Sequence, residues 1–402
     1  MFFPRLIYPE LLSHLRKPEA TIVTGMRRTG KTMLLERLFE EAQTSNKAFI
    51  DLEKRFNREV FDNSDYDEIL KNIVLQNKLN PKEKIYLFLD EIQTIKNLPS
   101  VMKYLFDHFG VKFIVTGSSS FYLRNLFSES MAGRKQLFEL YPLTFNEFLF
   151  FKGSIKQLPE MTMDISHIKK SDWWQEAYDN LYLEYLLYGG FPGVVLVNDE
   201  VDKKRILKEV LFSYIDQDVK NLSTFKKIGE MEKMIRLLAS RIGQKIDLAK
   251  ISREVGLARE TVEEYLYFLE QTFMIFTISP FSKSPDREIS KAKKLYFCDT
   301  GLANVLSPIS TGQALENAIF HSFQVRIPKK FAFLGINYYQ KKGGTEIDFI
   351  LNEEIGVEVK ETVDIYDFKR LGSLADKINL KKVKLISMNK TSEMNAIYAS
   401  QI

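Results

Sequence analysis

Residues 25–32 read Gly25-Met26-Arg27-Arg28-Thr29-Gly30-Lys31-Thr32 and fit the phosphate-binding pattern G-x-x-x-x-G-K-[ST]. An apolar run at 21–23 precedes them and predicts a buried strand, and a helical repeat over 33–38 follows. The glycines let backbone N–H groups converge on phosphate oxygens at a helix N-terminus. Lys31 can then reach the β- and γ-phosphates, and the Thr32 hydroxyl can ligate Mg²⁺. A turn that matches by chance is the alternative, and the flanking strand and helix argue against it.

Two later runs predict further strands that end in polar groups. The run 85–89 is apolar and ends in Asp90-Glu91, as expected for a strand that is covered on both faces. In a P-loop hydrolase an aspartate at this position holds Mg²⁺, and Glu91 is placed to polarise the attacking water. The run 111–118 predicts a third strand, and a hydroxyl at its tip could sense the γ-phosphate. Three strands in this order predict a nucleotide hydrolase.

Length and composition limit the class of protein. At 402 residues the chain is too long for one core, so we expect about two to four domains. The single cysteine, Cys298, excludes an internal disulfide and suits a reducing cytoplasm. No apolar run approaches the roughly 18–20 residues that span a bilayer, and the N-terminus lacks the features of a secretion signal. We therefore expect a cytoplasmic protein with no membrane partner, and the net charge of +4 permits contact with nucleic acid without arguing for it.

The patterns along the chain predict four parts. Residues 1–155 alternate strand-like and helix-like patterns, which is typical of a doubly wound α/β core. Residues 156–215 are helical and aromatic-rich, are broken at 189–193, and are expected to form a helical lid. Residues 216–300 hold three helical patterns and two strand-like runs, which is typical of a winged helix. Residues 301–402 are expected to form a small α/β domain.

Two functions compete for the winged-helix segment. Asp247 is expected to cap its second helix, and Gly256 to make the turn before its third. Such a third helix can recognise DNA in the major groove, but here its outward face is acidic and phosphates would repel it. A structural or protein-contacting role is therefore favoured, while the more basic wing could still touch a DNA backbone. The helix residues are Glu260, Glu263, Glu264 and Glu270 with Arg259, and the wing residues are Arg287, Lys291, Lys293 and Lys294.

Two alternating runs near the C-terminus, 346–351 and 355–360, predict a β-hairpin. The apolar pairs in the predicted register are Leu351 with Ile355, Phe349 with Val357, and Ile347 with Val359, all on one face. The other face then pairs Asp348 with Glu358, and Glu346 with Lys360.

Facing carboxylates beside a lysine suit metal-dependent phosphodiester cleavage. Asp348 and Glu358 could hold a divalent cation, and Lys360 could steady the nucleophile or the developing negative charge. Glu316 lies upstream on an expected helix among apolar neighbours, where a carboxylate needs a partner. A surface hairpin with cross-strand salt bridges explains the same spacing equally well.

The chain as a whole resembles prokaryotic and archaeal AAA-type ATPases that carry a C-terminal domain of unknown function. The resemblance covers nearly the whole length and rests on residues 25–32, Leu89-Asp90-Glu91-Ile92-Gln93, Thr116-Gly117-Ser118-Ser119, Ala132-Gly133-Arg134, residues 142–148, Gly189-Gly190-Phe191-Pro192, Asp299-Thr300-Gly301-Leu302, Leu315-Glu316-Asn317 and the hairpin carboxylates. It implies an ATP-binding α/β core with Mg²⁺, a winged helix and a terminal domain similar to PD-(D/E)xK nucleases.

The resemblance also implies roles for individual residues. The nucleotide-binding positions are Gly25, Met26, Arg27, Arg28, Thr29, Gly30, Lys31, Thr32, Thr116 and Ser118, the last two as alternative sensors of the γ-phosphate. The Mg²⁺ ligands are Thr32 and Asp90, and the catalytic residues are Glu91 as base and Asp90 as Walker B acid. Arg134 lies where an arginine finger could be supplied to a neighbouring subunit, with an ordinary surface arginine as the alternative. Glu316, Asp348, Glu358 and Lys360 match the nuclease motif positions, which implies a second Mg²⁺ or Mn²⁺.

Three functions remain open on the sequence. The first is an ATPase that acts on DNA, which the terminal domain cuts or grips. The second is a signalling ATPase that switches a protein-interaction surface, with an inactive terminal domain. The third is a defence or toxin nuclease that the ATPase controls. The candidate partners are accordingly ATP, DNA, a protein at the winged helix, and further copies of the chain.

Overall fold

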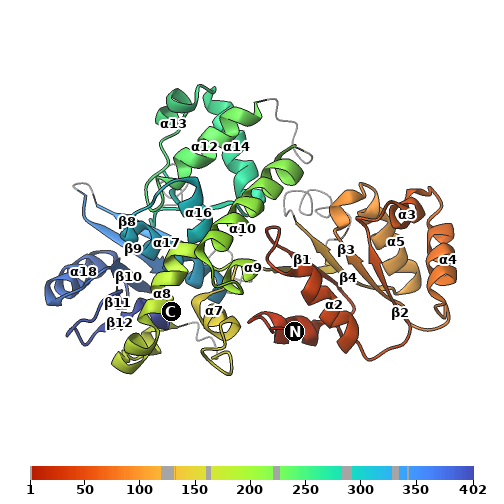
Figure 1. Cartoon of the computed structure of the whole chain (residues 1–402), viewed down its shortest axis with the longest axis horizontal. Coiled ribbons are helices and arrows are strands. Elements are labelled where there is room, and N and C mark those ends of the chain that lie inside the picture. Colours follow the sequence, from red (N-terminus) through yellow and green to blue (C-terminus); the bar gives the residue numbers. More distant parts are fainter. Residues whose placement is uncertain are drawn as a thin grey trace. The chain divides into compact units, whose positions relative to one another are not determined.

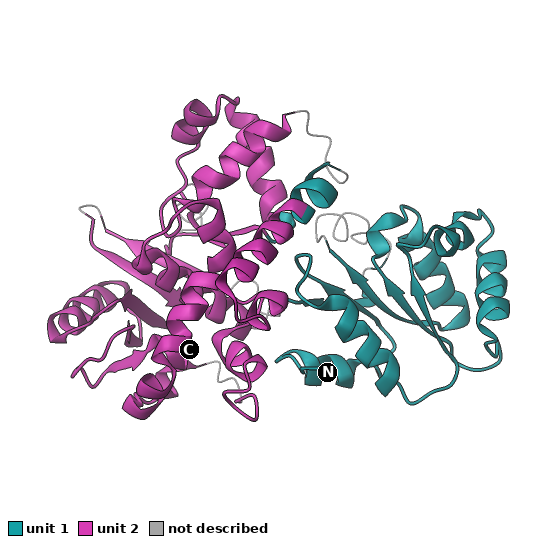
Figure 2. Ribbon diagram, viewed as in Figure 1, with its two compact units in different colours: residues 1–141, 213–224, 271–273 teal, residues 142–212, 225–270, 274–402 magenta. Residues whose placement is uncertain are grey.

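The computed structural model of the chain describes residues 2–118, 131, 133–159, 164–220, 227–282, 292–327, 335–341 and 344–402. The chain divides into two compact units (Figure 2). Unit 1 consists of residues 1–141, 213–224 and 271–273, and unit 2 of residues 142–212, 225–270 and 274–402. The predicted core, 1–155, thus corresponds largely to unit 1. The three later predicted parts fall in unit 2, apart from the two short segments that unit 1 takes up.

Unit 1 contains a five-stranded sheet in the order β2-β3-β4-β1-β5, with every neighbouring pair parallel (Figure 1). Its strands are β1 (Ala20–Thr24), β2 (Lys47–Asp51), β3 (Tyr86–Asp90), β4 (Lys112–Gly117) and β5 (Lys135–Glu139). The three strands predicted around the motifs are confirmed. Because all strands run in one direction, their carboxyl ends lie at one edge of the sheet, and the loops that follow β1 and β3 begin there, as does Ser118 after β4.

Helices cover both faces of this sheet. The neighbours Ile22 and Val23 of β1 belong to two separate apolar clusters, because successive residues of a strand face opposite sides. The helices of unit 1 are α1 (Tyr8–His14) and α2 (Lys31–Glu41) on the side of Val23, and α4 (Tyr66–Asn77) and α5 (Leu98–Phe109) on the side of Ile22. Shorter elements are α3 (Arg55–Glu59), η1 (Val60–Asp62), η2 (Ile92–Thr94) and a π-helix, η4 (Tyr214–Val219).

Unit 2 begins with helices and continues with the segment predicted to be a winged helix. Its first elements are α7 (Phe145–Phe151), η3 (Ile165–His167), α8 (Asp172–Tyr188), α9 (Pro192–Val195) and α10 (Glu200–Ser213). Then follow α12 (Ile228–Ala239), α13 (Leu248–Val255), α14 (Arg259–Gln271) and the antiparallel strands β6 (Ile275–Ile278) and β7 (Lys294–Phe297). Within the described part of the chain, no helix is long and apolar enough to span a bilayer.

The predicted ends of α13 and the acidic face of α14 are confirmed. Asp247 accepts a hydrogen bond from Lys250 N at 3.0 Å, and Gly256 ends α13 with φ 71°. On α14, Glu260, Glu263 and Glu264 are exposed. The exceptions to the prediction are that Glu263 pairs with Arg259 at 3.1 Å, and that Glu270 is half-buried and accepts a hydrogen bond from Thr277. Of the wing residues, Arg287 and Lys291 lie outside the described residues.

The C-terminal part of unit 2 is a second five-stranded sheet with helices packed on it. The sheet has the order β12-β11-β10-β9-β8. Its strands are β8 (Ile336–Gln340), β9 (Glu346–Leu351), β10 (Ile355–Lys360), β11 (Lys382–Ser387) and β12 (Ala396–Tyr398), and its helices are α16 (Thr300–Leu306), α17 (Thr311–Arg326), α18 (Ile365–Ile378) and η6 (Ala399–Gln401). The pairs β10–β11 and β11–β12 are parallel, and the pairs β8–β9 and β9–β10 are antiparallel.

The predicted hairpin of β9 and β10 is confirmed at its turn but wrong at its far end. Leu351 pairs with Ile355, and Phe349 with Val357, as predicted. Beyond them the pairing of β9 with β8 shifts by one residue, which is the mark of a β-bulge. As a result Phe349 packs against Phe320 and Phe323 of α17, whereas Ile347 packs in the cluster beneath α18. The residues predicted to share one apolar face therefore lie on two faces, and the change occurs at Asp348. The pairing of β9 with β8 causes this change, and the sequence pattern of the hairpin alone does not show it.

The segment predicted as a helical lid is helical, but it is part of the core of unit 2. From α8, Trp174 Nε1 donates to Ser400 O at 2.9 Å and Gln175 Nε2 donates to Met388 O at 2.8 Å. The helix thus packs along the C-terminal end of the chain, which the local pattern of α8 could not reveal.

The glycine motifs of unit 2 meet where α8, α16 and the start of α7 come together. A Cβ atom at Gly190 would lie 2.2 Å from Leu143 O, and one at Gly301 would lie 2.1 Å from Tyr188 O. The buried Asp299 caps α16 through Leu302 N at 2.9 Å and accepts from Gly190 N at 2.6 Å. Two motifs about 110 residues apart in sequence are therefore joined by close backbone approach.

We expect Gly190→Ala and Gly301→Ala each to lower the unfolding temperature by roughly 5–10 °C, since the added methyl group meets backbone that cannot move aside. Differential scanning calorimetry of the full chain measures this change. Gly193→Ala is the matched control, because its Cβ would lie 3.8 Å from Ile206 Cγ2, an ordinary contact. Equal unfolding temperatures for all three variants would contradict the account.

Candidate nucleotide-binding site

The loop between β1 and α2 has a backbone that depends on its glycines. Gly25 has φ 153° and Gly30 has φ 99°, both in the region that favours glycine. A Cβ atom at Gly25 would lie 2.0 Å from Leu140 O, so a side chain there would clash with the segment after β5. Gly30 directly precedes α2, which begins at Lys31. The loop therefore ends at a helix N-terminus, where free N–H groups and the helix dipole favour an anion.

Lys31 lies inside this loop. Its Nζ donates to Gly25 O at 3.0 Å and to Met26 O at 3.1 Å, and only 4% of the residue is exposed. Burial lowers the pKa of Lys31, and the nearby carboxylates Glu91 and Asp218 oppose this effect. An ammonium group in this position is suited to phosphate oxygens.

Thr32 and Asp90 meet at the carboxyl edge of the sheet. Thr32 Oγ1 donates to Asp90 Oδ2 at 2.8 Å, and Thr116 Oγ1 donates to the other oxygen of Asp90. Burial raises the pKa of Asp90, although the hydrogen bonds from Thr116 and Thr32 oppose the increase. A hydroxyl beside a carboxylate provides the oxygen ligands that Mg²⁺ prefers, so these residues fit the ion that the motif implies. Of the two alternative sensors, Thr116 is thus hydrogen-bonded to Asp90, and Ser118 is hydrogen-bonded to other partners.

Glu91 lies beside this pair and is connected to Ser118. Gln93 Nε2 donates to Ser118 Oγ at 3.0 Å and also to Glu91 Oε2. Glu91 itself adopts a left-handed backbone conformation, with φ 55°. This conformation is costly for a residue with a side chain and occurs often at functional sites. One amide thus holds both the candidate base and the candidate sensor, a role for Gln93 that the sequence analysis missed.

Asp218 of η4 is a second residue that the sequence analysis missed. Its carboxylate lies 3.3 Å from Arg27 Nε and accepts from Ser118 Oγ at 3.4 Å, and the residue is 2% exposed. Burial raises the pKa of Asp218 to about 6, although Arg27 and Lys31 oppose the increase. The π-helix of Asp218 offers a signal, since such turns are frequent at functional sites, but it is visible only in the structure.

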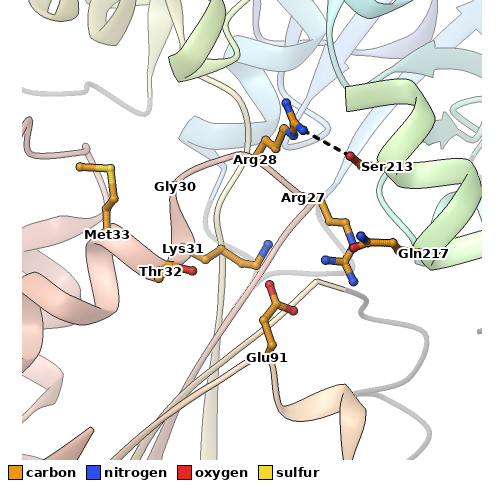
Figure 3. Close-up of a pocket in the computed structure, with 9 residues that line it drawn as sticks. All are labelled: Arg27, Arg28, Gly30, Lys31, Thr32, Met33, Glu91, Ser213 and Gln217. Carbon is orange, nitrogen blue, oxygen red and sulfur yellow. Dashed lines mark hydrogen bonds between the residues drawn. The ribbon is translucent and has the colours of Figure 1, made fainter. Parts of the chain in front are cut away.

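These groups surround a cavity of about 340 Å³ (Figure 3). The lining residues are Arg27, Arg28, Gly30, Lys31, Thr32, Met33, Glu91, Ser213 and Gln217. In Figure 3 the Lys31 and Glu91 side chains point toward one another, and Arg28 donates to Ser213 Oγ at 3.5 Å. The cavity thus combines a cationic phosphate loop with the carboxylate predicted to activate water.

Arg134 lies at the amino-terminal ends of β1 and β5, opposite to the end of the sheet that carries the phosphate loop. Its Nε donates to Asp107 Oδ1 at 2.7 Å, and its carbonyl accepts from Ala20 N at the start of β1. The phosphate loop follows the end of β1, at Thr24. Within one chain, Arg134 is therefore separated from Lys31 by the length of a strand, so any part in hydrolysis requires a second copy.

The four residues predicted as a nuclease-like site do not come together. Glu316 and Asp348 lie at Lys294 of β7, at 3.2 and 3.9 Å from its Nζ. Glu358 faces α18, where it pairs with Arg370 and with Lys360, the latter at 3.3 Å. Lys360 in turn pairs with Asp367. The predicted side-by-side placement of Asp348 and Glu358 is therefore wrong, because the bulge in β9 turns the two carboxylates toward different partners.

No group of three or more His, Cys, Asp or Glu side chains suited to a metal ion occurs among the residues that the structure describes.

Residues 17–149 match the model of a family described as AAA domain. This part of the chain is therefore similar to AAA domains. Residues 179–313, from within α8 to the start of α17, match a second family model, which is described as a domain of unknown function (DUF8612).

Similar proteins extend over most of the chain. An uncharacterized protein of Methanocaldococcus jannaschii is 29% identical over 377 residues, which cover 90% of this chain and 80% of that protein. An uncharacterized protein of Haemophilus influenzae is 27% identical over 313 residues, which cover 74% of this chain and 72% of that protein. Among solved structures, a Walker-type ATPase of Pyrococcus abyssi aligns with a TM-score of 0.47 and 16% identity over 76% of this chain and 96% of that one. The RuvB Holliday junction branch migration motor of Thermotoga maritima aligns with a TM-score of 0.32 and 16% identity, over 71% of this chain and 91% of that one.

The raised pKa of Asp218 predicts a pH dependence of stability. Because its folded pKa of about 6 lies above the usual value of 3.8, the folded chain binds the proton more tightly than the unfolded chain. Stability from this group is present at low pH and is lost as the pH rises from about 4 to about 6. We compare the free energies of unfolding in urea, without nucleotide, for Asp218→Asn and the wild type. As the pH rises across this window, the free energy of unfolding of Asp218→Asn should increase relative to that of the wild type by on the order of 2 kcal/mol.

Asp216→Asn is the matched control, since Asp216 lies on the same helix with 65% of its side chain exposed. If the difference in free energy of unfolding between Asp218→Asn and the wild type is the same at pH 4 and pH 7, Asp218 is not the source of the pH dependence.

Proposed function

We propose that the chain binds ATP and hydrolyses it with Mg²⁺ at the site of unit 1. The observation that carries the proposal is the hydrogen bond of 2.8 Å from Thr32 to Asp90, with Lys31 and Glu91 lining the adjoining cavity. A hydroxyl after the phosphate loop and a carboxylate at the end of β3 are brought to one point from 58 residues apart. Structural packing alone does not require that pairing.

The residues present divide the chemistry among them. Lys31 and the N–H groups at the start of α2 neutralise phosphate oxygens, and Thr32 with Asp90 would hold Mg²⁺, which offsets the charge of the β- and γ-phosphates. Glu91 orients the attacking water and accepts its proton. Ser118 lies where it can respond to the γ-phosphate, and Gln93 can relay that contact to Glu91.

We further propose that Arg134 supplies positive charge to the site of a neighbouring copy. In a single chain it is distant from the loop, and its side chain is 37% exposed while paired with Asp107. An arginine added in this way stabilises the charge of the transferring phosphoryl group.

For the rest of the chain, we propose that ATP turnover is coupled to a partner through unit 2. DNA is the first candidate, because α12 to β7 has the element order of a winged helix and the C-terminal sheet carries the nuclease-like motif. A regulatory ATPase that acts on a protein is the second candidate. It is favoured by the exposed glutamates of α14 and by the separation of Asp348 from Glu358. A defence-type nuclease under ATPase control requires cleavage activity. ATP turnover and Mg²⁺- or Mn²⁺-dependent cleavage, each with and without DNA, distinguish the three.

Lys31→Ala should abolish tight ATP binding, since the loop then buries phosphate charge without its cation. Glu91→Gln should retain binding and lose turnover by about a hundredfold or more, because only activation of the water is affected. Equilibrium binding of a fluorescent ATP analogue and phosphate release measure the two effects. Lys103→Ala and Glu40→Gln, on exposed positions of α5 and α2, are the matched controls. Wild-type turnover in Glu91→Gln would rule out Glu91 as the base.

If Arg134 acts on a neighbouring copy, the ATPase rate per chain should rise with protein concentration. Arg134→Ala should then lose on the order of a thousandfold in rate, and mixing it with Lys31→Ala should restore part of the activity, because each chain supplies what the other lacks. Arg37→Ala, on the exposed side of α2, controls for loss of a surface arginine. A rate per chain that stays constant over a wide dilution series would exclude this role.

A further inference from the structure

A lysine lies at the centre of three carboxylates in unit 2. Lys294 begins β7 and is 3% exposed. Its Nζ lies 3.2 Å from Glu316 Oε1 and 3.9 Å from Asp348 Oδ1, and it forms an ion pair with Glu346 Oε1. The ammonium group thus receives one carboxylate from α17 and two from β9. We call these four residues the Lys294 cluster.

The carboxylate oxygens of the Lys294 cluster have further donors. Tyr296 Oη donates to Glu316 Oε1 at 2.7 Å. Gln340 Nε2 donates to Glu346 Oε2 at 2.9 Å, and Val359 N donates to Asp348 Oδ2 at 2.8 Å. Glu346 and Asp348 therefore each direct one oxygen at the ammonium group and the other at a second donor, whereas Oε1 of Glu316 accepts from both Lys294 and Tyr296.

The charges fit this arrangement. Burial alone would lower the pKa of Lys294, but Glu316, Asp348 and Glu346 raise it above its usual value, so the lysine stays charged. Burial and the neighbouring Glu316 raise the pKa of Asp348 to about 7.

We propose that the Lys294 ammonium occupies the position and supplies the charge of the divalent cation that the acids of this fold would otherwise hold, so that the C-terminal sheet binds no catalytic metal. A metal would need Glu358 beside Asp348, and that carboxylate is instead held by Arg370 and Lys360. The residues present thus do not fit the metal that the nuclease-like motif implies. Unit 2 then serves as a binding or structural module. This inference is independent of the ATP site in unit 1.

The first test uses the full wild-type chain without nucleotide. The wild type and Asp348→Asn are each titrated calorimetrically with Mn²⁺, and each is unfolded thermally in Mn²⁺ and in EDTA. The heat of Mn²⁺ binding, and the change in unfolding temperature between EDTA and Mn²⁺, should be the same for the two chains. A Mn²⁺-dependent rise in unfolding temperature that is present in the wild type and absent in Asp348→Asn would overturn the proposal. This measurement is decisive even if no lysine variant folds.

The second test removes the ammonium group. Lys294→Met leaves three half-buried acids without their cation and should lower the unfolding temperature by about 10 °C. Millimolar Mn²⁺ or Ca²⁺ should restore much of this loss, and should not do so in Lys294→Met/Asp348→Asn. Lys293→Met is the matched control, because the neighbouring residue is exposed. A Lys294→Met chain as stable as the control, or one that no divalent cation restores, would contradict the proposal.

Discussion

The parallel pairing of β1, β4 and β3 is the constraint on which the candidate ATP site depends. Thr32 follows β1 and Asp90 ends β3, and β4 lies between those strands. Their side chains can meet only because parallel strands bring all carboxyl ends to one edge and the loops there converge. An antiparallel strand at either position would send one of the two groups to the opposite edge. The apolar residues on both faces of these strands are thus what position the polar ones.

The sequence was sufficient for elements whose signal is local. The phosphate loop, the three strands beside it, the caps at Asp247 and Gly256, and the turn of the C-terminal hairpin follow from patterns within about ten residues. Asp218 and Gln93 could not be found in that way. Asp218 lies about 190 residues after Arg27 in the sequence and contacts it only in the folded chain. The residues next to Asp218 in the sequence do not indicate a functional site. Gln93 is adjacent to the motif, but a glutamine there carries no chemical signal until its two partners are known.

The error at the C-terminal hairpin has a specific physical cause. Alternation along β9 and β10 fixes a register only while both strands remain regular, and β9 has a second partner, β8, whose pairing inserts a bulge at Asp348. One extra residue is enough to move a side chain to another face. The same event places Asp348 near Lys294, a residue that the sequence analysis assigned to a basic wing. Lys294 therefore looked like a surface charge, although it is the most buried cation of that segment within the described residues.

Among the acids around the phosphate loop, Asp218 is the one whose protonation state we expect to respond most to a bound nucleotide. Arg27, Arg28 and Lys31 face Asp90, Glu91 and Asp218, so the ionised site is close to neutral. A triphosphate with its Mg²⁺ brings net negative charge, which adds to the repulsion among the acids. In the proposed function Asp90 holds the metal and Glu91 activates the water, and Asp90 accepts hydrogen bonds from two hydroxyls. Asp218 has neither task, and its interactions with Arg27 and Ser118 are the ones a phosphate would compete for. If the chain binds ATP as proposed, we therefore expect the negative charge of the nucleotide to favour the protonated form of Asp218, whose pKa is already raised by burial.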